Sequence, residues 1–176
     1  MQKSLTKNSI YNIIYTIANI LFPFATSIYV SRILLPAGVG KVASAQNIVS
    51  YFVTLAALGL PSYGVREFAN VREKNHERNK LFTELLLVNI ISTTLAVVGF
   101  IGLVVANEGF SGQWALYAAC GLSIAFNYLN IDWMYQGLEE YGYITGRSLL
   151  IKGISLLALF LFVKTREDYV IYALIS

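Results

Sequence analysis

The chain has few of the residues from which catalytic and metal centres are built. It contains one cysteine, Cys120, and one histidine, His76, in 176 residues. A single cysteine excludes an internal disulfide framework, and a lone histidine leaves neither a histidine-based triad nor a metal cluster. Because Cys120 lies within an apolar run, we interpret it as a small buried hydrophobe. We therefore expect no metal and no other cofactor.

Charge is also scarce. Charged residues make up 13% of the chain and hydrophobic residues 56%, whereas soluble domains carry about 25% charged residues. So few charges cannot cover a water-facing surface, and the composition predicts an integral membrane protein surrounded by lipid. The net charge of +3 is small and the basic residues form no stripe, so nucleic acid is not an expected partner. Walker, GxSxG and HExxH motifs are absent, which argues against an ATPase or a soluble-type hydrolase.

Long apolar runs recur along the chain, and a membrane-spanning helix needs about 20 such residues. We expect spans at residues 9–35, 42–60, 81–106, 114–135 and 149–163, with a sixth run opening at 169. The predicted fold is an all-α polytopic membrane helix bundle of five full spans and a truncated sixth. Because the sequence stops inside an apolar run, we interpret residues 1–176 as a single transmembrane domain and the N-terminal fragment of a longer protein.

Tryptophans and basic residues suggest how the spans lie. Trp114 and Trp133 are 19 positions apart, about 28 Å along a continuous helix, so we interpret them as anchors at the two interfaces. Basic residues are more frequent on the side that holds the N-terminus, which predicts a cytoplasmic N-terminus. That side holds Lys3, Lys7, Arg66, Arg72, Lys74, Arg78, Lys80, Arg147 and Lys152, and the other holds Arg32, Lys41, Lys164 and Arg166.

Polar side chains recur at helical spacing inside the spans. The stripes are Asn12, Thr16 and Asn19; Asn47, Ser50 and Thr54; Asn89, Ser92 and Thr93; and Ser123, Asn127 and Asn130. Two interpretations remain open. The stripes could hydrogen-bond to one another in a dry bundle, or they could line a shared, water-filled cavity through which a polar substrate passes. The cost of a bare amide in lipid, several kcal/mol, slightly favours the cavity.

Two arginines near span ends also allow two roles each. Arg32 lies about 37 Å along the helix from Lys7, near the outer end of the span. There its guanidinium could reach the membrane surface as an anchor, or it could bind a phosphate through two hydrogen bonds. Arg66 belongs to the polar loop at 63–80. This loop could form a surface helix bound to anionic headgroups, or Arg66 and Arg72 could lie at the entrance of a cavity.

Four segments resemble polysaccharide-exporting flippases of the O-antigen type. They are KNSIYNIIYTIANILFPFATSIYVSRILLPAGVG (7–40), YFVTLAALGLPSYGVREFANVRE (51–73), IDWMYQGLEEYGYIT (131–145) and FVKTREDYVIYALIS (162–176). The resemblance implies the multidrug/oligosaccharidyl-lipid/polysaccharide exporter fold, of which this chain would be most of one of two lobes around a central cavity. It also implies flipping of an undecaprenyl-pyrophosphate-linked oligosaccharide across the bacterial cytoplasmic membrane by alternating access, without covalent chemistry.

By this resemblance, basic cavity residues hold the pyrophosphate and polar ones the sugar. The candidate substrate-binding residues are Arg32, Arg66, Arg147, Lys152, Asn12, Thr16, Asn19, Asn47, Asn127 and Asn130. Expected partners are the lipid-linked oligosaccharide, membrane lipids and, as candidates, polysaccharide assembly proteins. The alternatives are a multidrug or cation exporter of the same superfamily, which would favour acids in its cavity, and a membrane-embedded sugar or acyl transferase. A transferase could use only Asp132, Glu139 and Glu140.

Overall fold

The computed structural model describes residues 5–176, and its side chains from Ser9 onward except Ser111. Within this range the chain is a bundle of helices without strands. Its helices are α1 (Leu5–Ala57), α2 (Leu60–Asn70), α3 (Asn75–Ala106), α4 (Trp114–Phe126), α5 (Asp132–Gly137), α6 (Tyr141–Phe162) and α7 (Tyr169–Ile175), with 3₁₀ turns η1 (Glu108–Gln113) and η2 (Asn127–Leu129). The predicted all-α membrane helix bundle is thus confirmed.

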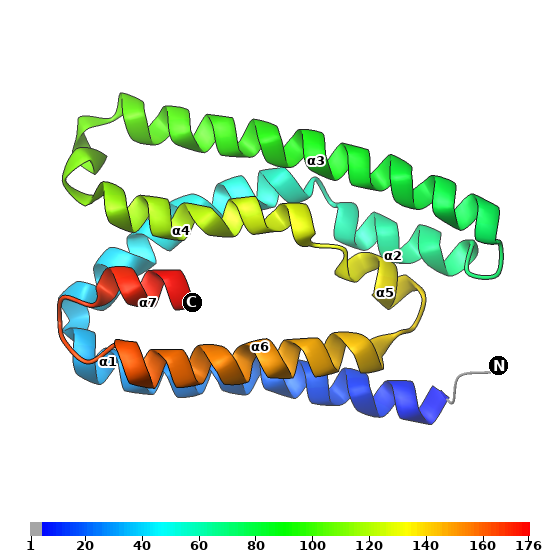
Figure 1. The fold of residues 1–176 in the computed structure, drawn as a ribbon, viewed down its shortest axis with the longest axis horizontal. Coiled ribbons are helices and arrows are strands. Elements are labelled where there is room, and N and C mark those ends of the chain that lie inside the picture. Colours follow the sequence, from blue (N-terminus) through cyan, green and yellow to red (C-terminus); the bar gives the residue numbers. More distant parts are fainter. Residues whose placement is uncertain (1–4) are drawn as a thin grey trace.

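α1 is two helices joined at a sharp break. Leu35 has φ 56° and ψ 171°, a non-helical conformation, and Pro36 follows it. Proline disfavours helical geometry in the residue before it, so the break falls at Leu35. We call residues 5–34 the first arm and residues 36–57 the second arm. Figure 1 shows the chain reversing between them, which agrees with the predicted end of the first span.

Two later spans are also interrupted. The second arm is followed by Leu58 and Gly59, whose φ angles are 44° and 74°, and the chain then continues as α2. Glycine reaches such positive φ without a steric penalty. The fourth span passes from α4 through η2 to Asn130, which is extended (φ −79°, ψ 90°), before α5 begins. Each of these spans is therefore a pair of shorter helices.

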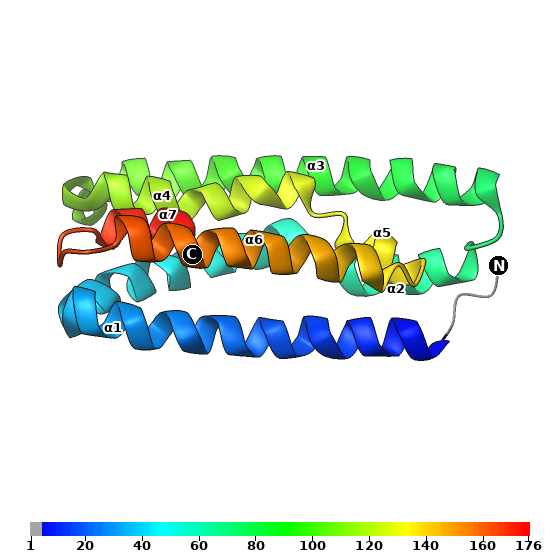
Figure 2. The same ribbon diagram turned by 60° about the horizontal axis from the view of Figure 1, so that its bottom comes forward.

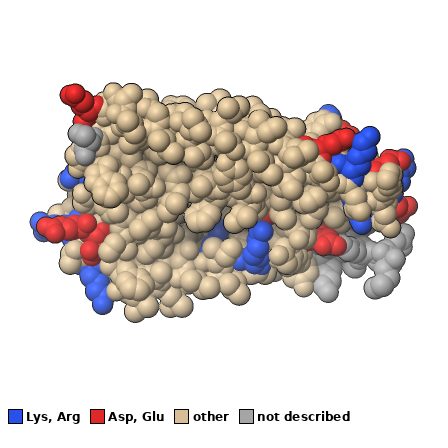
Figure 3. All heavy atoms as spheres, turned by 45° about the horizontal axis from the view of Figure 1, so that its top comes forward, with Lys and Arg blue, Asp and Glu red and all other residues tan. Residues whose placement is uncertain are grey.

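Within residues 5–176, three helical stretches are long and apolar enough to cross a membrane. By length and composition they are Ser9–Asn70, Asn75–Ala106 and Tyr141–Phe162, and Trp114–Leu129 is a shorter apolar helix. The first stretch folds back at Leu35 and so provides two antiparallel helices (Figures 1 and 2). Charged side chains gather at the two ends of the bundle in Figure 3, and most of the surface between them is uncharged.

Apolar packing holds the two arms of α1 against different helices. The second arm buries Val42 and Val49 in a cluster with Phe100 of α3 and Ile124 of α4. The first arm packs against α6 through a second cluster, Val30, Leu34, Leu159 and Val163. Tyr29 Oη also donates to the carbonyl oxygen of Val163 at 3.0 Å, because α6 ends there and leaves that carbonyl without a helical partner.

The predicted role of Trp133 as an interface anchor is wrong. Its side chain is 2% exposed and packs against Phe68 and Phe82, whereas Trp114 is 68% exposed. A separation of about 28 Å would require one continuous helix from Trp114 to Trp133. Because the helix is interrupted at Asn130, the Trp133 side chain points into the interior between α2 and α3.

Candidate functional site

Lys152 lies in the middle of α6. The predicted fifth span began at residue 149, which placed Lys152 on the inner side of the membrane. The helix in fact begins at Tyr141 and ends at Phe162, so Lys152 is about 15 Å along the axis from each end. The predicted assignment of Lys152 to an inner segment is therefore corrected, because α6 begins about two turns earlier than residue 149.

The partner of Lys152 is an amide and not an acid. Its Nζ donates to Oδ1 of Asn19 on the first arm and lies 5.7 Å from the ring centre of Phe22. No carboxylate in the described part of the chain forms an ion pair with it. A cation at this depth is costly in lipid, at least about 2.5–3.5 kcal/mol, so such residues face a protein interior or a wet cavity.

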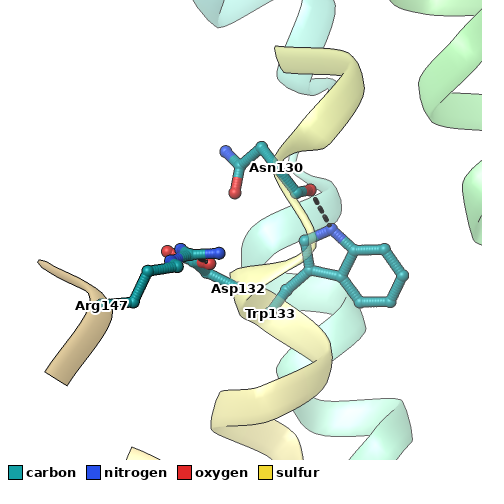
Figure 4. A network of polar contacts seen from close by, with 4 residues as sticks. All are labelled: Asn130, Asp132, Trp133 and Arg147. Carbon is teal, nitrogen blue, oxygen red and sulfur yellow. Dashed lines mark hydrogen bonds and ion pairs between the residues drawn. The ribbon is translucent and has the colours of Figure 1, made fainter. Parts of the chain in front are cut away.

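Arg147, in contrast, is neutralised within the chain. Its guanidinium forms an ion pair with Asp132 of α5, and the two side chains are 34% and 23% exposed. Figure 4 shows them facing each other beside the turn at Asn130. The Arg147 Nε atom is buried and has no hydrogen-bond partner among the described residues. In the sequence, Asp132 was considered as an acid for a transferase, and its pairing with Arg147 was missed, although an acid inside an apolar span could have suggested a basic partner.

The polar stripe of the first arm is exposed on the surface of the described chain. Asn12, Thr16 and Asn19 are all exposed. The Thr16 hydroxyl donates to the carbonyl oxygen of Asn12 at 2.9 Å, within its own helix. Asn19 joins the stripe to α6 through Lys152. Asn47 on the second arm is exposed as well.

The stripe of α3 forms a buried network with the fourth span. Asn89 Nδ2 donates to the carbonyl oxygen of Asn127 at 2.9 Å, and Asn127 Nδ2 donates to Asn89 Oδ1 at 2.9 Å and to Thr93 Oγ1 at 2.8 Å. All three residues are buried. Of the two interpretations of the stripes, interhelical hydrogen bonding describes this part of the bundle. Asn127, a predicted substrate-binding residue, directs its amide into this network.

The remaining candidates lie apart from Lys152. Arg32 is exposed three residues before the break at Leu35, and no side-chain partner for it occurs in the described residues. Arg66 of α2 is exposed, pairs with Glu67 at 3.0 Å and lies 5.5 Å from the ring centre of Tyr63. The structure therefore brings Asn19 and Lys152 together but does not join the ten candidates in one contact network.

The turn at Asn130 is held by its backbone. The carbonyl oxygen of Asn130 accepts a hydrogen bond from Trp133 Nε1 at 2.9 Å, as Figure 4 shows, while its side chain is exposed. This contact places Asp132 toward α6. Across residues 5–176, the described histidine, cysteine and acidic side chains form no group of three or more that could hold a metal ion.

Comparisons with known proteins identify the family to which the chain belongs. Residues 5–176 match the family model described as "Polysaccharide biosynthesis protein". Two curated proteins named "Putative O-antigen transporter" are similar: one from Escherichia coli K12, 20% identical over 98% of this chain, and one from Shigella dysenteriae, 27% identical over 87%. The matches cover 42% and 38% of those proteins, so the chain spans only about two fifths of their length. No solved structure matches. The chain belongs to the polysaccharide biosynthesis protein family.

Proposed function

We propose that this chain forms part of a transporter that flips a lipid-linked oligosaccharide across the bacterial cytoplasmic membrane by alternating access. The substrate is a surface polysaccharide unit, such as an O-antigen repeat, on an undecaprenyl pyrophosphate carrier. The proposal starts from the family match along the whole described chain and from the names of the two relatives. The N-terminus lies on the cytoplasmic side in this proposal.

The observation that carries the proposal is Lys152. It is a cation at the middle of α6 with an amide partner and without a carboxylate partner among the described residues. A pyrophosphate group would supply the missing negative charge, and a lysine binds phosphate as a compact point charge. Asn12, Thr16 and Asn19 lie along the neighbouring face of the first arm and offer amides and a hydroxyl to a sugar chain.

The distribution of acids also favours an anionic substrate over a cationic one. An exporter of cations needs an acid free to meet its substrate, but Asp132 is paired with Arg147. Flipping requires no covalent step, so the scarcity of catalytic residue types in the sequence is compatible with this function.

A deletion strain tests the proposal. The gene for the full-length protein is removed from a strain without a redundant exporter, and surface glycan and lipid-linked intermediates are measured. We expect surface glycan to be lost and the intermediate to accumulate on the inner leaflet, with both restored by the wild-type gene. Normal surface glycan in the deletion strain would overturn the proposal. Loss of glycan without any lipid-linked intermediate would also overturn it and would indicate a biosynthetic enzyme.

A further inference from the structure

Two neighbouring spans are interrupted beside the same turn of α3. Ser92 Oγ donates to the carbonyl oxygen of Ala56 at 2.6 Å, where the second arm ends. Asn89 Nδ2 donates to the carbonyl oxygen of Asn127 at 2.9 Å, where α4 ends. Residues three apart share one helix face and lie about 4.5 Å apart along the axis. The two breaks are therefore level with each other.

Beyond the breaks, α2 and α5 approach each other closely at two glycines. A Cβ atom at Gly64 of α2 would lie 2.7 Å from Trp133 Cε3, and one at Gly137 of α5 would lie 2.5 Å from Phe68 Cβ. The Phe68 and Trp133 rings meet edge to face, with centres 5.4 Å apart. Contact this close leaves the two helices little freedom to move relative to each other. They lie side by side in Figures 1 and 2.

An arginine clamps the far ends of the same two helices. Arg72, which follows α2, forms an ion pair with Glu139 at 2.9 Å through Nη2 and donates to the carbonyl oxygen of Gly137 at 3.2 Å. Glu139 follows α5 in the chain. The two helices are thus joined both along their length and at the end farther from the breaks. We call residues 60–72 and 132–139 the α2–α5 unit.

The borders of the α2–α5 unit are strained. Leu58 and Glu139 have φ angles of 44° and 56°, and Leu35 is the other non-glycine residue with positive φ in the described chain. Side chains other than glycine rarely adopt this conformation. Conformational hinges are a few positions at the ends of elements that absorb changes in φ and ψ. Such end positions occur at two borders of the unit: Leu58 and Gly59 precede α2, and Glu139 follows α5.

The unit touches both α3 and α6. Against α3 it mainly buries apolar side chains, with Phe68 and Trp133 next to Phe82 and Leu85; the one long polar contact is from Arg78 Nη1 to the carbonyl oxygen of Arg72 at 3.5 Å, among the described residues. Such a surface allows small sliding movements between helices.

Against α6 the unit has the stacked rings of Tyr135 and Tyr143, with centres 4.6 Å apart, and the Asp132–Arg147 ion pair. The bonds of the ion pair are directional and favour one position.

We infer that the α2–α5 unit moves as one body about the two level breaks, and that the Asp132–Arg147 ion pair latches it in the position described here. The unit lies at the end of the bundle where α1 begins (Figure 1). A movement there would open or close that end of the lobe. The inference concerns distances within the protein and does not depend on the identity of a substrate.

Spin labels on the full-length protein in nanodiscs test this inference. One pair, at Ser62 and Leu150, reports the distance from α2 to α6, and a second pair, at Ser62 and Gln136, reports the distance from α2 to α5. We expect Asp132→Asn to add a second, shifted component to the first distance and to leave the second unchanged. Glu84→Gln is the matched control, because it removes an exposed carboxylate of α3, and it should change neither distance.

Two results would overturn the inference. One is a single, unshifted α2–α6 distance in Asp132→Asn. The other is an α2–α5 distance that broadens as much as the α2–α6 distance, because the two helices would then move separately. Should Asp132→Asn fail to fold, Leu58→Gly relaxes the hinge without touching a charge. It should broaden the α2–α6 distance alone, and an unchanged distribution there would equally reject the hinge.

Discussion

Asn89 and Asn127 exchange hydrogen bonds across the bundle, side chain to side chain at 2.9 Å and side chain to backbone at 2.9 Å. Both are buried, so neither amide can turn to water when the other is removed. The pair joins α3 to the place where α4 ends. It explains how a broken span can lie inside a membrane bundle with its backbone satisfied.

This pair predicts coupled losses of stability. Asn89→Ala or Asn127→Ala should each lower the free energy of unfolding by about 1–3 kcal/mol, because a buried amide loses its partner. The double variant should cost less than the sum, with a coupling of about 0.6–2 kcal/mol. Denaturant unfolding of the purified full-length variants measures these values. Strict additivity would show that the two amides do not depend on each other.

Glycines of the α2–α5 contact should not tolerate a methyl group. At Gly137 an added Cβ would lie 2.5 Å from Phe68 Cβ and 2.9 Å from the Val65 carbonyl oxygen. Gly137→Ala should therefore destabilise the protein by about 1–3 kcal/mol, as overpacked sites do. The matched variant is Gly153→Ala in α6, which meets nothing within 4 Å and should gain about 0.5–1 kcal/mol from the added helix propensity. Equal melting temperatures for the two variants would contradict the packing described here.

The turn before α7 should depend on pH. The Asp168 carboxylate accepts backbone hydrogen bonds from Lys164 at 2.9 Å and Thr165 at 2.7 Å, and these bonds lower the pKa of Asp168. A lowered pKa in the folded state means that the carboxylate stabilises the turn above its ordinary pKa, about 4, and loses this effect as pH falls through the lowered value.

Hydrogen exchange checks the prediction for this turn. The amides of Lys164 and Thr165 should be protected at pH 7, and protection relative to the intrinsic rate should fall below about pH 4. Asp168→Ala should remove the protection at neutral pH. Protection that persists in this variant would mean that the carboxylate does not hold the turn.

Lys152 and Arg32 have no carboxylate partner among the described residues, and we expect their positive charge to matter for export. If Lys152 meets an anion, Lys152→Arg should retain part of the export of surface glycan and Lys152→Met very little, since only the former keeps the charge. For Arg32 we likewise expect Arg32→Lys to retain part and Arg32→Gln very little. Complementation of the deletion strain gives the readout. Equal export from Arg32→Lys and Arg32→Gln would make Arg32 a membrane anchor.

The sequence predicted most of the helices because their signals are local. Apolar runs and Pro36 are read directly from the chain, and the break occurs at Leu35, next to that proline. The interruption at Asn130 lacks a proline or glycine and was missed. That omission misplaced Trp133, whose burial depends on Phe68 and Phe82 from other helices.

The candidate site was predictable in its residue types but not in its pairings. Helical spacing identified the stripes of Asn19 and Asn89 alike, yet one is exposed beside Lys152 and the other is buried against Asn127. The difference depends on which helix faces each stripe. Asp132 and Arg147 meet across the turn between α5 and α6, where Glu139 has φ 56°.

Flipping by purified full-length protein tests the central claim most directly. Proteoliposomes carry a lipid-linked oligosaccharide, and a glycosidase added outside reports how fast the inner pool becomes accessible. Wild-type protein should expose the inner pool, Lys152→Arg should do so more slowly, and Lys152→Met should approach the rate of protein-free vesicles. Equal rates for wild type and Lys152→Met would contradict the role of this lysine, and a wild-type rate equal to that of empty vesicles would contradict flipping itself.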